Sequence, residues 1–175
     1  TKSSTQDKPN IEKYYLEQVL KVANPTQVDI KYNVDNKTAY KTIVSSLKDY
    51  QQFAVIREMV NQTQLKVRIE GCETVRDKNG LALSSRNFNL NEEQLKDALI
   101  IVDTLRFIKN NKNRFEIDHL LETAKGFFNK GKLTLEYLDI VDAQSFEKVN
   151  KLNQKSVCCI AAFCGQVRLI DNILL

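Results

Sequence analysis

A tight turn and a loop with residue types suited to anion binding are adjacent near the middle of this chain. Asn79-Gly80 predicts the turn, because both residue types tolerate positive φ. Ser84, Ser85 and Arg86 follow with two hydroxyls and a guanidinium, whose rigid donor fork matches phosphate oxygens. No carboxylate interrupts this stretch. An ordinary polar surface loop would look the same, so the residues alone leave both interpretations open.

The composition is that of an ordinary globular protein. Apolar residues make up 42% of the 175 and charged residues 27%, which allows a hydrophobic core in one domain or two small ones. The net charge of +4 is mild, and basic residues alternate with acidic ones, which argues against nucleic-acid binding. No run of about 18 apolar residues occurs, and residues 1–10 lack an apolar signal core. We therefore predict a cytoplasmic protein without a membrane segment. The mild positive charge is compatible with anionic small molecules as ligands.

The cysteines and the single histidine argue against a zinc site. The four cysteines form no Cys-x-x-Cys pair, and His119 is the only histidine. Cys158, Cys159 and Cys164 lie in an apolar, strand-like run, where free cysteine behaves as a small hydrophobic residue. We expect buried, reduced thiols, no protein-bound metal and a surface position for His119.

Hydrophobic periodicity divides the chain into helices and strands. Helices are expected over residues 11–23, 45–62, 91–108 and 115–129, and strands over 28–34, 65–69, 133–141, 157–163 and 167–173. Asn91 with Gln94 three residues later predicts a capping box. The last two strands are expected to form a hairpin across Gly165-Gln166.

The order of these elements predicts an α/β fold in two parts. Residues 1–72 are interpreted as a truncated or shortened α/β unit. Residues 73–175 are interpreted as a small α+β domain with an antiparallel sheet. An unfinished parallel sheet in the first part would expose strand edges, so either a homodimer or local disorder is expected.

Three segments, in order, resemble pantothenate synthetases (pantoate–β-alanine ligases). The stretch 80–87, Gly-Leu-Ala-Leu-Ser-Ser-Arg-Asn, is similar to the nucleotide-lid motif of that family. Residues 48–52, Lys-Asp-Tyr-Gln-Gln, with 55–60 after them, resemble the segment that contacts ATP and pantoate. Residues 167–172, Val-Arg-Leu-Ile-Asp-Asn, resemble the family's closing strand. The resemblance runs from residue 48 to the last residue, nearly three quarters of the chain.

The resemblance implies the end of a Rossmann-like nucleotide-binding domain followed by a smaller lid domain. It implies condensation of pantoate with β-alanine, with ATP and Mg²⁺ as cofactors and no covalent enzyme intermediate. Pantoate would first attack the α-phosphorus of ATP to give pantoyl adenylate and pyrophosphate, and β-alanine would then displace AMP. Catalysis of this kind depends on alignment and on stabilising charge at phosphorus.

The resemblance also assigns roles to individual residues. Catalytic roles fall on Lys48, Ser84, Ser85 and Arg86, which would bind the ATP phosphates and the departing pyrophosphate. The expected ATP-binding residues are Lys48, Asp49, Val75, Leu83, Ser84, Ser85 and Arg86, with Asp49 at the ribose and Val75 at the adenine. The expected pantoate-binding residues are Gln52 and Gln27. Without the resemblance, Lys48 and Asp49 would be interpreted as a solvated helix start, and Gln52 as an exposed helix residue.

The chain departs from the family pattern in three ways. The family's His-x-Gly-His segment is absent, because His119 is the only histidine. Ser46-Leu47 stands where the family has Gly-Glu, and the interval from Asn24-Pro25-Thr26-Gln27 to Lys48 is shorter than in the family. Residues 1–47 are a shortened N-terminal part, a chance match or an artefact. A second hypothesis therefore stands beside the ligase: a non-catalytic nucleotide-binding or assembly module that keeps the lid fold.

Overall fold

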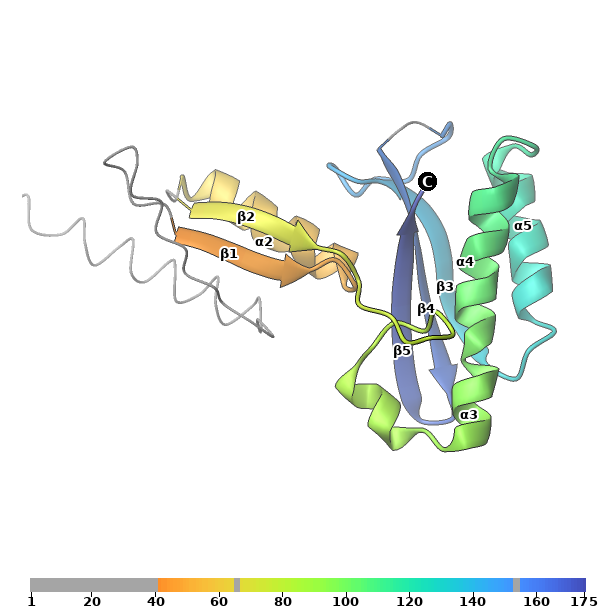
Figure 1. Ribbon diagram of the computed structural model, residues 1–175. Helices are drawn as coiled ribbons and strands as arrows, with labels where there is room; N and C mark the ends of the chain where they lie inside the picture. Colours follow the sequence, from red (N-terminus) through yellow and green to blue (C-terminus); the bar gives the residue numbers. More distant parts are fainter. Residues whose placement is uncertain (1–40, 65–66, 153–154) are drawn as a thin grey trace, which may run out of the picture. The chain divides into compact units, whose positions relative to one another are not determined.

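A computed structural model describes residues 41–64, 67–152 and 155–175 of the chain (Figure 1). These residues fall into two compact units. The first contains the described residues up to Leu47 together with Gln51–Glu73, and the second contains Lys48–Tyr50 and Thr74–Leu175. The helix expected over 11–23, the strand expected over 28–34 and Gln27 lie outside the described residues.

The first unit is a strand–helix–strand arrangement. It comprises β1 (Lys41–Ser46), most of α2 (Tyr50–Gln62) and β2 (Val67–Cys72). The two strands are parallel, with Lys41 opposite Val67 and Ser46 opposite Cys72. One face of α2 is buried, and Ile56 is fully inaccessible.

The predicted start of this helix is wrong. We expected a helix from residue 45, but residues 41–46 form β1 and α2 begins at Tyr50. The β-branched run Thr42-Ile43-Val44 favours a strand. Pairing with β2 extends past the strand end, because the Leu47 N–H donates to the Cys72 carbonyl at 2.8 Å.

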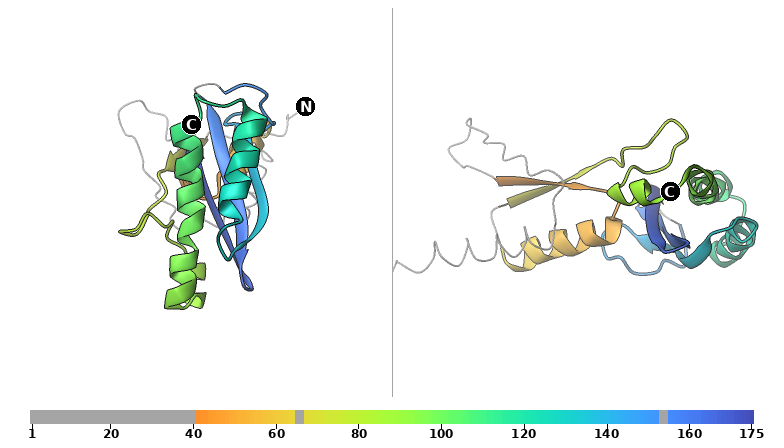
Figure 2. Two further views of the ribbon diagram at one scale, coloured as in Figure 1. Left: turned by 90° about the vertical axis from the view of Figure 1, so that its right-hand side faces the viewer. Right: turned by 90° about the horizontal axis from the view of Figure 1, so that it is seen from below.

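The second unit is an antiparallel sheet covered by helices. Its elements are η1 (Ser85–Asn89), α3 (Glu92–Asp97), α4 (Leu99–Asn111), α5 (Ile117–Phe128), β3 (Thr134–Asp142), β4 (Ser156–Cys164) and β5 (Val167–Leu174). The strand order is β3-β4-β5, and both pairs are antiparallel. Helices α4 and α5 lie side by side over one face of the sheet (Figures 1 and 2). The predicted antiparallel sheet and its β4–β5 hairpin are confirmed.

The core lies between that face and the two helices. Alternate residues of each strand point toward α4 and α5, as the period of two in a strand requires. The largest fully buried side chains in this cluster are Ile101, Leu105, Ile108, Leu120, Phe128, Leu138 and Ile160. Burying each contributes about 1.5–3 kcal/mol, so the cluster is the main source of stability for the unit.

The capping box at Asn91 is confirmed. The Asn91 side chain accepts from the Gln94 N–H at 2.8 Å, and the Gln94 side chain accepts from the Asn91 N–H at 3.0 Å. The single helix expected from this point is divided, because α3 ends at Asp97 and α4 begins at Leu99.

The predicted turn at Asn79-Gly80 is also confirmed, with a different backbone from the one expected. Gly80 has a φ of +94°, but Asn79 is not among the residues with positive φ. The turn begins at Asp77, whose carbonyl accepts from the Gly80 N–H at 3.0 Å and whose carboxylate accepts from the Leu81 N–H at 2.9 Å. A type I turn followed by a left-handed glycine explains this pattern, and only Gly80 needs conformational freedom.

A buried ion pair attaches this turn to β5. Asp171 is 3% exposed and lies on the edge strand, on the same face as Leu169. The Arg76 guanidinium donates to both Asp171 carboxylate oxygens, at 2.6 and 2.8 Å, and also to the Gly80 carbonyl at 3.0 Å. A buried carboxylate requires such a partner, because an uncompensated charge in an apolar interior is costly.

We predict that Arg76→Ala lowers the free energy of unfolding by about 3 kcal/mol, because it leaves the Asp171 carboxylate buried without its guanidinium. Urea unfolding followed by circular dichroism measures the change. Arg114→Ala is the matched control, since Arg114 is exposed just after α4, and its cost should stay below about 0.5 kcal/mol. Equal losses in the two variants would contradict the prediction.

Candidate functional site

Seven of the nine predicted site residues belong to the second unit. They are Lys48, Asp49, Val75, Leu83, Ser84, Ser85 and Arg86. Gln52 lies in the first turn of α2 and belongs to the first unit. Gln27 lies outside the described residues. The second unit therefore brings together the residues expected for ATP.

Lys48 reaches a segment that we call the flap, residues 75–86. The Lys48 ammonium donates to the Leu83 carbonyl at 3.1 Å, and the Leu83 N–H donates to the Val75 carbonyl at 2.9 Å. The Val75 and Leu83 side chains are 68% and 51% exposed. The Lys48 ammonium thus contacts a turn segment from which two apolar side chains, those of Val75 and Leu83, are accessible. A phosphate group and a flat base could use this combination of groups.

The flap residues Ser84, Ser85 and Arg86 are held by local hydrogen bonds. Ser84 is the N-cap of η1, and its hydroxyl oxygen accepts from the Arg86 N–H at 3.2 Å. A hydroxyl that accepts one bond can still donate its own hydrogen. Ser85 and Arg86 are exposed, and the Arg86 guanidinium donates to the Arg168 carbonyl on β5 at 3.3 Å.

Electrostatics make this region favourable for an anion. Burial lowers the pKa of Lys48, and the nearby Arg86 and Arg76 lower it further, whereas Asp171 and Asp49 raise it. The hydrogen bond to Asp171 raises the pKa of Arg76, and the Asp171 carboxylate compensates the positive charge of the Arg76 guanidinium. Lys48 and Arg86 are positive groups close enough to repel each other. A bound anion that contacts both would relieve this repulsion.

Sequence reasoning assigned no role to three residues that organise the site: Arg76, Asp171 and Asn172. Asn172 is 7% exposed, and its side-chain amide donates to the Lys48 carbonyl at 2.9 Å. A signal was present, because Asp171 and Asn172 stand between the apolar residues Leu169-Ile170 and Ile173-Leu174. A polar group in a buried strand needs a partner, but one sequence does not identify that partner.

Three of the four thiols are unsuited to nucleophilic chemistry, and the fourth, that of Cys72, is exposed. Cys158, Cys159 and Cys164 are buried, as expected. Burial raises the pKa of Cys158 well above its usual range and that of Cys159 to about 12. A buried neutral thiol is a poor nucleophile. Across the described ranges, no group of three His, Cys, Asp or Glu residues could hold a metal ion. His119 is exposed, and its ring contacts that of Phe115.

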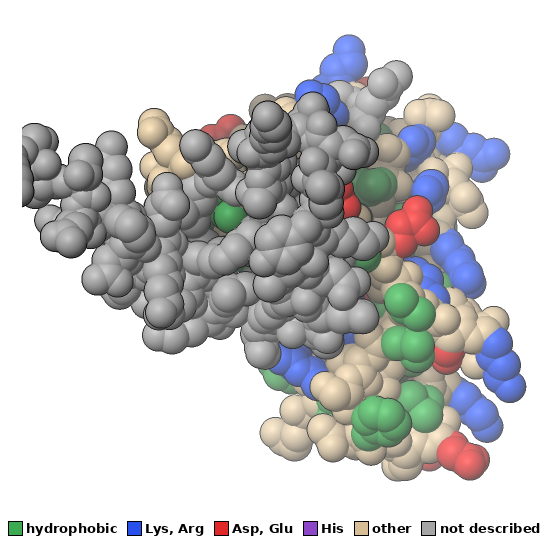
Figure 3. All heavy atoms as spheres, turned by 60° about the vertical axis from the view of Figure 1, so that its left-hand side comes forward, with side chains coloured by type: hydrophobic (Ala, Val, Ile, Leu, Met, Phe, Trp, Pro, Cys, Tyr) green, Lys and Arg blue, Asp and Glu red, His purple; other side chains and the backbone are tan. Residues whose placement is uncertain are grey.

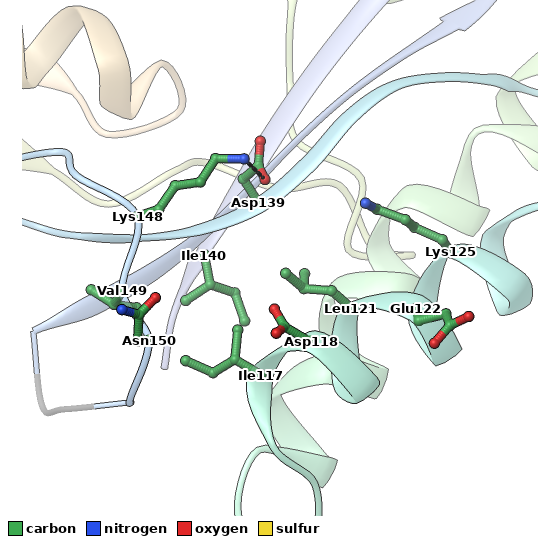
Figure 4. A pocket seen from close by; sticks show the side chains of 10 residues that line it. All are labelled: Ile117, Asp118, Leu121, Glu122, Lys125, Asp139, Ile140, Lys148, Val149 and Asn150. Atoms are coloured by element: carbon green, nitrogen blue, oxygen red, sulfur yellow. Dashed lines mark ion pairs between the residues drawn. The ribbon is translucent and has the colours of Figure 1, made fainter.

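A pocket of about 320 Å³ lies away from these residues, between α5, β3 and residues 148–150 (Figure 4). The side chains of Ile117 and Ile140 point toward each other in it, and Lys148 pairs with Asp139 at 3.0 Å. Three carboxylates and two lysines line the pocket, so its charge is nearly balanced. None of the predicted site residues contributes to it.

Several exposed apolar side chains accompany the flap. Besides Val75 and Leu83, Phe88 in η1 is 91% exposed. Hydrophobic side chains gather beside basic ones on the face shown in Figure 3. No helix in the described part of the chain has the length and apolar character needed to cross a membrane.

Comparison with known proteins identifies a family. The profile of the family described as Pantoate-beta-alanine ligase matches residues 36–174. The pantothenate synthetase of Bacteroides fragilis is 45% identical over 133 residues, which cover 72% of this chain and 46% of the relative. That of Bacteroides thetaiotaomicron is 42% identical over 135 residues, with the same coverage. The chain spans about half the length of the curated relatives that it matches.

Solved structures show the same similarity. Pantothenate synthetase from Thermus thermophilus has a TM-score of 0.72 at 28% identity, covering 76% of this chain and 49% of that one. Pantoate-beta-alanine ligase from Francisella tularensis has a TM-score of 0.53 at 29% identity, covering 76% and 43%. The latter structure is a complex with Beta-gamma ATP and β-alanine.

We predict that Lys48 titrates below the ordinary lysine value of 10.5, and that Arg86→Ala raises this pKa by removing a neighbouring positive charge. NMR of the Lys48 side-chain Cε–H group as a function of pH measures both values. Arg114→Ala, which removes an exposed arginine outside the flap, should leave the Lys48 titration unchanged. A Lys48 pKa at or above 10.5, or one that Arg86→Ala does not raise, would contradict this electrostatic picture.

Proposed function

Because this chain belongs to the pantoate–β-alanine ligase family, we propose that it takes part in the ATP-dependent condensation of pantoate with β-alanine. The hydrogen bond from the Lys48 ammonium to the carbonyl of Leu83, the residue before Ser84, is the observation that carries this proposal. The Francisella relative, solved with Beta-gamma ATP and β-alanine, supports ATP and β-alanine as ligands.

The reaction has two displacement steps. A pantoate carboxylate oxygen attacks the α-phosphorus of ATP, a new O–P bond forms, and the bond to the bridging oxygen breaks to release pyrophosphate. The β-alanine amine then attacks the acyl carbon of pantoyl adenylate, AMP leaves, and the amine loses a proton. Both steps develop negative charge on phosphate oxygens, so fixed positive groups and donors lower the barriers.

The flap and Lys48 supply those groups. The Lys48 ammonium and the Arg86 guanidinium would contact the β- and γ-phosphates and stabilise the departing pyrophosphate. Ser84 and Ser85 would donate hydroxyl hydrogens to phosphate oxygens. Val75 and Leu83 would pack against the adenine, and Asp49, next to Lys48, would accept from the ribose hydroxyls.

Magnesium fits this site as a companion of ATP. Asp171 is occupied by Arg76, and the flap itself contributes donors. Phosphate oxygens would therefore be the main ligands of Mg²⁺, which commonly keeps several waters and is bound through substrate phosphates. The ion would supply additional charge at the triphosphate.

The first unit contains Gln52, one of the two residues expected to bind pantoate. Its β1–α2–β2 arrangement has the parallel pairing from which Rossmann-like sheets are built. We therefore assign it to the end of such a domain. Gln52 in α2 would hydrogen-bond the pantoate hydroxyls or carboxylate, and Gln27 is expected to do the same.

We predict that ATP binds the flap and that Arg86→Ala weakens this binding at least about tenfold, because it removes one of the two cations nearest the flap hydroxyls. Titration of ¹⁵N-labelled chain with Mg²⁺-ATP should shift the backbone amides of residues 83–86. Arg114→Ala is the control and should bind ATP as the unchanged chain does. No shift in the flap, or equal affinities for the two variants, would remove the lid assignment.

Release of AMP distinguishes a ligase from a binding module. A ligase releases AMP only when pantoate and β-alanine are both present, and Lys48→Ala should reduce that rate by roughly 10²–10³. ATP binding without AMP release, from this chain and from a version extended to the length of its relatives, would favour the non-catalytic module.

Binding of ATP should weaken as pH rises through the lowered pKa of Lys48, because the neutral amine loses its attraction for phosphate. This loss should begin below the pH at which an ordinary lysine titrates. Lys48→Arg should extend binding to higher pH, since a guanidinium stays protonated there. Identical pH profiles for the two proteins would contradict a phosphate contact by Lys48.

A further inference from the structure

Asn172 links three segments that are far apart in the sequence. Its side-chain amide donates to the Lys48 carbonyl at 2.9 Å, and its own carbonyl accepts from the Arg76 guanidinium at 3.2 Å. Its N–H donates to the neighbouring Asp171 carboxylate at 2.8 Å. One residue near the end of β5 therefore contacts both the Lys48 segment and the base of the flap.

Strand geometry explains how one position does this. Successive side chains of a strand point to opposite faces, so Asp171 and Asn172 leave β5 on different sides. Asp171 binds the flap through Arg76, whereas Asn172 reaches the main chain at Lys48. The end of β5 thus fixes the flap and Lys48 relative to each other.

We propose that Asn172 is a positioning residue for nucleotide binding, which acts by holding the main chain at Lys48 so that its ammonium stays at the flap. The inference rests on the proposed contact between Lys48 and ATP phosphates. Asn172 itself touches neither ATP nor substrate in this proposal.

The contact suits asparagine specifically. The acceptor is a carbonyl, so the Asn172 group facing it must be the NH₂, and a carboxylate in its place has no hydrogen to donate. The amide is buried, so its removal leaves the Lys48 carbonyl without this donor in a site where water has little access.

Anchoring of the main chain at Lys48 matters because a lysine side chain is long and flexible. The side chain has many rotamers, and their entropy opposes any single placement of the ammonium. Asn172 anchors the Lys48 carbonyl, and two residues later the buried Tyr50 hydroxyl donates to the Ala143 carbonyl at 3.2 Å. With the Lys48 carbonyl and the Tyr50 side chain both held, the Lys48 side chain has fewer placements to lose when it meets a phosphate.

A double-mutant cycle tests whether Asn172 acts through Lys48. Mg²⁺-ATP affinity is measured by NMR titration for the unchanged chain, Asn172→Ser, Lys48→Ala and the double variant. Serine is too short to reach the Lys48 carbonyl. We expect Asn172→Ser to weaken binding about tenfold when Lys48 is present and to have no further effect in the Lys48→Ala background. Asn110→Ser, an exposed change in α4, is the control.

Each other outcome overturns the inference in a distinguishable way. Equal weakening in both backgrounds means that Asn172 acts on the fold and not through Lys48. Unchanged affinity in Asn172→Ser removes the positioning role while leaving the proposed function intact. Unchanged affinity in Lys48→Ala removes the phosphate contact on which both proposals rest. If Asn172→Ser does not fold, Asn172→Asp, which keeps the shape and removes the donor, enters the same cycle with Asn110→Asp as control.

Discussion

The buried ion pair between Arg76 and Asp171 is the interaction on which the second unit's site depends. Two parallel hydrogen bonds at 2.6 and 2.8 Å join a flap residue to a strand 95 positions later. Such a bidentate pair fixes orientation as well as distance. Because removal of either partner leaves a poorly solvated charge, the flap base cannot leave β5 without a large free-energy cost.

This pair also determines the charge of the site. Arg76 is compensated by Asp171, so it contributes structure more than attraction for a ligand. Lys48 and Arg86 carry the remaining attraction, and burial of Lys48 strengthens its interactions by reducing the screening effect of water. The flap is thus anchored at Arg76, with Lys48 at Leu83 and Arg86 at its last residue. In our proposal, these fixed cations are preorganised for the phosphates of a nucleotide.

Local features of the sequence predicted much of the fold. Apolar runs, continuous over residues 157–163, indicated the antiparallel strands, and the Asn91–Gln94 pair correctly marked a helix start, because each signal depends on neighbouring residues. The β1 strand was missed because Ile43 and Val44 are its only apolar residues, and so short a run shows no clear period although its β-branched residues favour a strand.

The sequence named candidate residues for the site but not the contacts that connect them. The flap residues and Lys48 could be named from their resemblance to a family, but Arg76, Asp171 and Asn172 act through contacts that span 95 to 124 positions. Periodicity carries no information about such pairs. A buried acidic residue in an apolar strand indicates that a partner exists, and only the fold identifies it.

A crystal structure of the chain with a non-hydrolysable ATP analogue tests the central claim most directly. The account predicts phosphate oxygens within hydrogen-bond distance of the Lys48 ammonium, the Arg86 guanidinium and at least one flap hydroxyl, with the Arg76–Asp171 pair intact. A nucleotide bound elsewhere, or a flap that releases Asp171 when it closes, would contradict it.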